Sequence, residues 1–155
     1  MAMVQAEENI KVVIRIRPIN EMEKGRGETS CVRGNKAESS EGDDDFEHNE
    51  VQVRVGPHDA HVYNCNRCFH PEVTQTNFFQ ECGLTGLLDS AIGGYRACAF
   101  AFGQTGAGKT HTIVGPGNST MPGKDDDGIL GNSLLYLYKK LNSLGVEYKL
   151  RLSCM

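Results

Sequence analysis

The stretch "GQTGAGKT", Gly103–Thr110, decides which fold this sequence is expected to adopt. It fits the phosphate-binding pattern G-x-x-x-x-G-K-[ST] without a mismatch. Its glycines let the backbone wrap closely around phosphate groups, because they carry no Cβ atom. We expect Lys109 to reach the β- and γ-phosphates and the hydroxyl of Thr110 to bind Mg²⁺. The stretch therefore predicts a loop that holds a nucleoside triphosphate.

The sequence on both sides of this loop is the context that a phosphate loop requires. Before it, "ACAFAF" (Ala97–Phe102) is apolar without alternation and predicts a strand buried on both faces. After it, Lys109–Val114 predicts the opening of a helix, which "GPGN" (Gly115–Asn118) ends after roughly two turns. A glycine-rich turn that contains a lysine by chance is the alternative, and the order of strand, loop and helix argues against it. The dinucleotide pattern G-x-G-x-x-G does not fit, because position 111 is His.

Three further strands are predicted upstream of the loop. "KVVIRIRP" (Lys11–Pro18) is rich in β-branched residues and predicts a strand that its proline ends. The polar stretch Asn20–Asn49 predicts a solvated loop. "VQVRV" (Val51–Val55) and "AHVYN" (Ala60–Asn64) alternate with a period of two residues, and "GPHD" between them favours a hairpin.

The remaining elements complete an alternating order of helices and strands. Apolar residues at helical spacing predict one helix over Thr74–Ile92 and another over Ile129–Leu144, which Gly145 ends. "VEYKLRLSC" (Val146–Cys154) alternates throughout and predicts a strand. This order indicates an α/β layered fold. We expect an unpaired last strand to be a poor end for a domain.

Length and composition limit the class of protein. A chain of 155 residues is one domain or part of one. Its net charge of −4 gives no reason to expect a nucleic acid as partner. The N-terminus does not resemble a secretory signal, and the longest apolar run is too short to cross a bilayer, so no membrane partner is expected. The six cysteines are accordingly expected to be reduced in the cytosol.

Three other patterns are candidate metal sites. "CNRCFH" (Cys65–His70) has zinc-like C-x₂-C spacing, but Cys82 and Cys98 lie on predicted regular elements and do not form a matching second pair. Small buried thiols are the favoured interpretation. "DDDF" (Asp43–Phe46) and "DDDG" (Asp125–Gly128) follow no apolar strand, so solvated loops are favoured over a carboxylate for metal-assisted hydrolysis. We therefore expect a nucleotide site without catalytic residues in this sequence.

Three residues outside the loop are each open to two interpretations, and a fourth has one suggested role. His111 directly follows the loop and either contacts the base or ribose of the nucleotide or is an exposed helix residue. Arg15 and Arg17 share one face of the first predicted strand, which could equally be a solvent-facing edge. Pro18 beside them offers a flat apolar surface to an adenine.

Taken together, five stretches resemble the N-terminal half of the kinesin motor domain. The patterns R-x-R-P, T-Q-x-x-F-F and G-Q-T-G-x-G-K-T-H-T occur in the order and spacing of that family, and the resemblance runs from about Ile10 to Met155. The stretches are "IKVVIRIRPIN" (Ile10–Asn20), "FHPEVTQTNFF" (Phe69–Phe79), "GGYRACAFAFGQTGAGKTHTIVG" (Gly93–Gly115), "DGILGNSLLYLY" (Asp127–Tyr138) and "YKLRLSCM" (Tyr148–Met155).

The resemblance implies a P-loop NTPase-type layered fold of the kinesin motor, truncated to its N-terminal half. Residues 1–9 would be a flexible N-terminus and residues 10–155 an incomplete motor domain. ATP and Mg²⁺ are the implied cofactors, with Thr110 on the metal, and microtubules are the implied partner. Arg15, Arg17 and Pro18 would join His111 around the adenine. The other implied nucleotide-binding residues are Gly103, Gln104, Thr105, Gly106, Ala107, Gly108, Lys109 and Thr110.

The sequence also departs from the kinesin pattern. Cys65 and Asn66 stand where the family usually has an aromatic–Asp pair, and "GILGN" (Gly128–Asn132) lacks the usual Pro-Arg. The switch I and switch II segments that position the attacking water are not in this sequence, so we expect no motor-like ATP hydrolysis from these residues alone. The first hypothesis is the ATP-binding portion of a kinesin-like microtubule motor of the cytoplasm and cytoskeleton. The alternatives are a truncated, non-catalytic nucleotide-binding or interaction protein and another P-loop enzyme.

Overall fold

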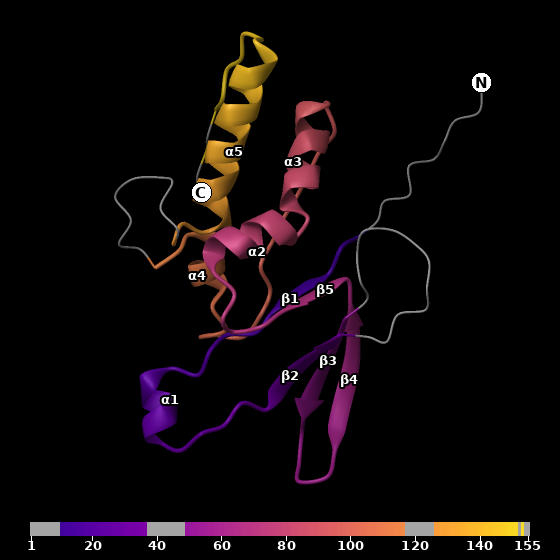
Figure 1. Cartoon of the computed structure of the whole chain (residues 1–155), viewed down its shortest axis with the longest axis vertical. Helices are drawn as coiled ribbons and strands as arrows, with labels where there is room; N and C mark the ends of the chain where they lie inside the picture. The colour runs from indigo at the N-terminus through magenta and orange to yellow at the C-terminus, as the bar shows by residue number, and fades with distance from the viewer. Residues whose placement is uncertain (1–9, 37–48, 117–125, 152, 154–155) are drawn as a thin grey trace, which may run out of the picture. The chain divides into compact units, whose positions relative to one another are not determined.

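The computed structural model describes residues 10–36, 49–116, 126–151 and 153 (Figure 1). The chain forms two compact units, a first unit of Met1–Val73 and a second unit of Thr74–Met155. In chain order the elements are β1 (Val13–Arg15), α1 (Glu21–Gly25), β2 (Val32–Lys36), β3 (Asn49–Arg54), β4 (Ala60–Cys65), β5 (Arg67–Phe69), α2 (Gln75–Glu81), α3 (Leu84–Ile92), α4 (Lys109–Ile113) and α5 (Ile129–Leu144).

A short parallel ladder lies at the core of the first unit. β1 pairs in parallel with β5, and the amide of Ile16 extends the ladder by donating to the carbonyl oxygen of Phe69 at 2.9 Å. The β-branched residues of β1 favour this extended conformation. The strand predicted over Lys11–Pro18 is confirmed at its central residues, Val13–Arg15. The buried apolar residues of this unit are Ile16, Val51, Cys65 and Phe69.

The first unit also contains an antiparallel sheet of β2, β3 and β4, in that order. β3 and β4 are the predicted hairpin, with Val51 opposite Tyr63. The amide of Val55 donates to the carbonyl oxygen of Asp59 at 2.9 Å and closes the turn. β2 pairs with β3 along its whole length, which adds a strand that the sequence patterns did not predict.

Part of the predicted loop Asn20–Asn49 is regular, so that prediction is wrong there. α1 begins with a capping box, in which the amide of Glu23 donates to Asn20 Oδ1 at 2.9 Å and the amide of Asn20 donates to Glu23 Oε2 at 2.8 Å. The N-x-x-E pattern in the sequence could have indicated this helix. The residues of β2 show no comparable local pattern. This strand is stabilised by its pairing with β3, which a local pattern does not reveal. Residues 37–48, including the acidic run at 43–46, lie outside the described residues.

Helices dominate the second unit. α3 and α5 lie side by side and α2 packs across their base (Figure 1). The predicted helix Thr74–Ile92 is divided into α2 and α3 at Gly83, whose φ of +82° ends the helical path. Phe78 and Phe79 on α2 are buried. The Phe79 ring meets the Tyr136 ring of α5 edge-on, with 6.3 Å between the ring centroids.

α5 confirms its prediction at both ends. It covers Ile129–Leu144, and Gly145 follows with a φ of +64°, the left-handed conformation that commonly ends helices. Asp89 Oδ1 on α3 accepts a hydrogen bond from the Tyr136 hydroxyl at 2.9 Å and lies 3.2 Å from Lys140 Nζ. These two α5 groups hold the pKa of Asp89 below its ordinary value. Among the described helices, none is both long and apolar enough to cross a membrane.

Two predicted strands do not form within the described residues of the second unit. Residues 97–102 and 146–151 have no ladder partner. Phe100 is 81% exposed and Phe102 is 95% exposed, and Cys98 is exposed with them. A buried strand needs hydrogen-bonded neighbours and packed layers on both faces, and no described segment supplies them. The prediction of a buried strand at residues 97–102 is therefore wrong for this structure, as is that of Val146–Cys154 over its described residues.

Candidate nucleotide site

The loop between residues 103 and 108 is tightly turned. Gly103 has a φ of +157° and Gly108 a φ of +94°, and the latter lies in the left-handed region that favours glycine. A Cβ atom at Gly103 would lie 2.9 Å from the Cβ atom of Ala107, closer than side chains normally approach. The loop therefore closes on itself because these positions carry no side chains.

Lys109 crosses this loop with its side chain. Its Nζ donates to the carbonyl oxygen of Gly103 at 2.7 Å and to that of Gln104 at 2.9 Å. The two bonds hold the ammonium group at the loop, where it can neutralise negative charge on a bound phosphate. The predicted contact of Lys109 with the phosphates of a nucleotide stays a prediction.

The start of α4 offers further donors. Thr112 makes the first backbone hydrogen bond of the helix, to Gly108 at 2.9 Å, so the amides of Lys109 and Thr110 have no acceptor within the helix. Gly108 has no side chain to cap them. The exposed Thr110 presents a hydroxyl beside these amides. Backbone amides, one ammonium group and one hydroxyl are a donor set that fits a triphosphate with its Mg²⁺.

Gln75 braces the start of α4 and was not among the predicted site residues. Its amide Nε2 donates to the carbonyl oxygen of His111 at 2.5 Å and lies 3.3 Å from His111 Nδ1. Gln75 is 4% exposed, whereas His111 is exposed. The T-Q-x-x-F-F pattern contains this glutamine and was the available signal, but only the fold shows that α2 meets α4.

The junction between α4 and α5 is unusually close. Gly115, with a φ of +97°, follows α4, and the amide of Gly128 donates back to the carbonyl oxygen of Val114 at 3.3 Å. Asp127 is 5% exposed, and its carbonyl oxygen accepts from Asn132 Nδ2 at 2.6 Å. The prediction that the acidic run at 125–128 is solvated is therefore wrong for Asp127, because the residue is enclosed where the two helices meet.

Three of the four residues predicted near an adenine belong to the first unit. Arg15 donates from Nη2 to the carbonyl oxygen of Val73 at 3.2 Å. Arg17 forms an ion pair with Glu23 at 2.5 Å, which raises the pKa of Arg17 and lowers that of Glu23. Pro18 is exposed. The loop lies in the second unit, so the grouping of these residues with His111 stays a prediction.

The two thiols of the C-x₂-C pattern lie in an apolar setting. Cys65 is buried and Cys68 is half-buried. Burial raises the pKa of both, and the neighbouring Cys65 helps raise that of Cys68 to about 11. In the absence of metal, both thiols are therefore expected to be protonated near neutral pH. Within the described ranges, no three His, Cys, Asp or Glu side chains gather in a metal-binding group.

A sequence model of the kinesin motor domain matches residues 15–155. Kinesin-like protein Klp61F of Drosophila melanogaster is 31% identical over 96% of this chain and 13% of its own length. Kinesin-like protein KAR3 of Saccharomyces cerevisiae is 31% identical over 91% of this chain and 18% of its own length. The chain thus spans less than a fifth of either relative.

Solved kinesin structures share the arrangement of these elements. The C-terminal motor domain of Kar3 from Candida glabrata superposes with a TM-score of 0.68 and 27% identity, over 88% of this chain and 40% of that chain. The motor domain of the Kar3-like kinesin from Ashbya gossypii gives a TM-score of 0.69 and 27% identity, over 88% of this chain and 38% of that chain. The α/β fold expected from the sequence is confirmed by these similarities.

Proposed function

The chain belongs to the kinesin motor domain family, and from this membership we propose that it is the ATP-binding portion of a kinesin-like microtubule motor. The parent activity would be ATP hydrolysis coupled to movement along microtubules. The protein would accordingly work at the cytoskeleton. The motor activity, the microtubule partner and the location at the cytoskeleton are all inferred from membership of this family.

One observation carries the nucleotide part of the proposal. The loop at residues 103–108 turns through backbone conformations that suit glycine, and Lys109 bridges two of its carbonyl groups. The amides that open α4 follow immediately, without intrahelical acceptors. This combination supports a site for the charged end of a nucleoside triphosphate.

Each residue would have a separate role in binding. The loop amides would surround the β-phosphate, Lys109 would neutralise charge on the β- and γ-phosphates, and Thr110 would hold Mg²⁺. The Mg²⁺ held there would supply positive charge that offsets the charge of the phosphates. The His111 imidazole, with Gln75 against it, would lie beside the base. Arg15, Arg17 and Pro18 remain proposed partners of the adenine.

Binding of Mg·ATP by the chain tests the proposal. Equilibrium dialysis would compare the unmodified chain with Lys109→Ala and with Lys139→Ala, which removes an exposed lysine of α5. Loss of a charge-assisted contact should weaken binding by about 10- to 100-fold in Lys109→Ala and leave Lys139→Ala unchanged. Circular dichroism would establish that both variants are folded. Equal ATP affinity in all three proteins, or no binding by the unmodified chain, would contradict the proposed site.

A further inference from the structure

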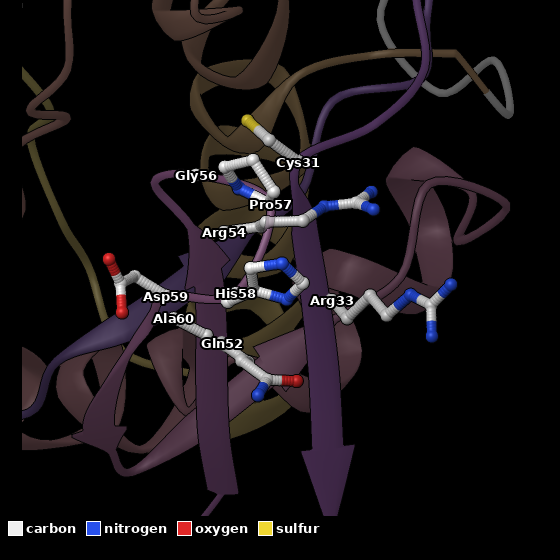
Figure 2. Close-up of a pocket in the computed structure, with 9 residues that line it drawn as sticks. All are labelled: Cys31, Arg33, Gln52, Arg54, Gly56, Pro57, His58, Asp59 and Ala60. Carbon is white, nitrogen blue, oxygen red and sulfur yellow. The ribbon is translucent and has the colours of Figure 1, made fainter.

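A polar pocket lies in the first unit, on the antiparallel sheet. Its volume is about 220 Å³, and it is formed where the turn at residues 56–59 lies over one face of β2 and β3 (Figure 2). Nothing in the nucleotide-binding proposal uses these residues. The pocket is lined by Cys31, Arg33, Gln52, Arg54, Gly56, Pro57, His58, Asp59 and Ala60.

The strand register gathers the polar groups of this pocket. Arg33 of β2 lies directly opposite Gln52 of β3, so both side chains project from the same face of the sheet. Arg54 is two residues beyond Gln52 and shares that face. Val51 projects from the opposite face and is 3% exposed. One face of the sheet therefore packs into the core, and the other presents two arginines and an amide.

The positive charge of these arginines is not neutralised within the described residues. Arg54 Nη2 donates to the uncharged carbonyl oxygen of Ser30 at 3.1 Å. No carboxylate of the described ranges forms an ion pair with Arg33 or Arg54. Asp59 is the acidic residue of the lining, and Figure 2 shows its carboxylate pointing away from the side to which both guanidinium groups extend. The pocket is thus a concave surface with net positive charge.

The turn adds a further donor and fixes its position. The amides of Val55 and Gly56 both donate to the carbonyl oxygen of Asp59, at 2.9 Å and 3.4 Å. These bonds hold the turn closed, with the His58 ring among the lining side chains (Figure 2). The imidazole N–H, the Gln52 amide and two guanidinium groups are the side-chain donors that this lining offers to an anion.

We propose that this pocket binds a phosphate monoester. A phosphate monoester carries a charge near −2 and three acceptor oxygens, so it can engage two guanidinium groups at once. A carboxylate has one charge and two oxygens, which a single guanidinium group satisfies. The volume is several times the roughly 30 Å³ that one water molecule occupies, so a phosphoryl group and part of its carrier fit. A phosphorylated side chain and a free phosphorylated small molecule share this chemistry.

Titration with phosphoserine, followed residue by residue through amide NMR shifts, tests this pocket. Phosphoserine should shift amides between residues 31 and 60, and this readout separates the pocket from the loop at residues 103–108. Arg33→Ala should weaken that binding by about tenfold, since a charge-assisted contact is lost. The affinity of Arg33→Lys for phosphoserine should lie between those of the unmodified chain and of Arg33→Ala, because lysine retains the charge but lacks the planar guanidinium group. Arg26→Ala, which removes another exposed arginine of the first unit, is the matched control and should bind normally.

The source of the phosphate can be determined in the same experiment. A phosphoserine peptide that binds more tightly than phosphoserine, while its unphosphorylated form does not bind, would identify a phosphorylated chain as the partner. Equal binding of peptide and phosphoserine would identify a small phosphate monoester. Absence of shifts between residues 31 and 60, or equal affinity in Arg33→Ala, would overturn the proposal. If ATP still bound at residues 103–108 in that case, the proposal of a nucleotide site would stand although the proposal for this pocket had failed.

Discussion

Two apolar stretches of the second unit, α5 and residues 97–102, differ in whether the predicted element forms. α5 forms over the predicted residues and packs on α2 and α3. Residues 97–102 are at least as apolar, yet they form no strand and expose Phe100 and Phe102. A helix satisfies most backbone groups within itself, whereas a strand depends on neighbours. The difference shows that composition predicts a helix more directly than a buried strand.

The nucleotide loop comes directly after residues 97–102 in the chain. Like α5, however, it is held by hydrogen bonds between residues that are close in sequence. Its bonds run from Lys109 to Gly103 and Gln104, over six residues or fewer. Glycine conformations and the short helix α4 supply the rest of its geometry. The loop can therefore keep its form without a ladder at residues 97–102.

The largest expected effect compares one phenylalanine from each kind of region. Phe79→Ala removes a side chain that is 7% exposed and packed against Tyr136, and should lower the free energy of unfolding by about 3 kcal/mol. Phe102→Ala removes one that is 95% exposed and should change it by less than about 0.5 kcal/mol. Urea unfolding of both variants measures the difference. Similar losses would show that residues 97–102 are packed after all.

A smaller loss of stability is expected at the junction of α4 and α5. In Gly128→Ala the new Cβ atom would clash with the carbonyl oxygen of Ile113, so the backbone must shift, at a cost of about 2 kcal/mol. Gly86→Ala, inside α3, meets no atom within 4 Å and should raise stability by about 0.5–1 kcal/mol. Opposite shifts of the urea midpoint are predicted. A neutral Gly128→Ala variant would contradict the close junction.

Gln75→Ala should lower the affinity for ATP more than the affinity for a phosphate ligand that has no base. Without its contacts to His111, the imidazole beside the base should be less well oriented, and ATP affinity should fall by about three- to tenfold. Affinity for inorganic tripolyphosphate, which has no base, should stay within about twofold. Gln80→Ala, at an exposed position on the same helix, is the control. Equal losses for ATP and tripolyphosphate would indicate a merely structural role for Gln75.

The smallest expected effect is a pH dependence at the contact between α3 and α5. The pKa of Asp89 is lowered in the folded chain, first by the Tyr136 hydroxyl and then by Lys140. Its contribution to stability is therefore complete above its ordinary pKa of about 3.9 and is lost as pH falls through the lower folded value. Asp89→Asn should be less stable than the unmodified chain at pH 6, and the gap should close near pH 2. A gap that is constant between these pH values would argue against the ion pair.

The sequence predicted best those parts whose bonds are local. Gly145 marked the end of α5, and the loop pattern located Lys109 and the start of α4. α1 was also predictable, because Asn20 and Glu23 form a capping box at a recognisable spacing. In each case the decisive hydrogen bonds join residues close in sequence.

The parts that were missed depend on residues far apart in the chain. β2 forms because it pairs with β3, and Arg33 meets Gln52 only through that register. Gln75 supports His111 because α2 lies against α4, although thirty-six positions separate the two residues. Asp127 was predicted to be solvated, and its enclosure depends on how α4 approaches α5. Sequence patterns contain the residues of these contacts but not the pairings.

Hydrogen exchange at residues 103–111, with and without Mg·ATP, tests the central claim most directly. If the loop and the first amides of α4 surround the triphosphate, nucleotide should slow exchange from Gly103 to His111 in the unmodified chain. The slowing should be lost in Lys109→Ala and retained in Lys139→Ala. Unchanged exchange across these residues at saturating Mg·ATP would contradict a nucleotide site at this loop.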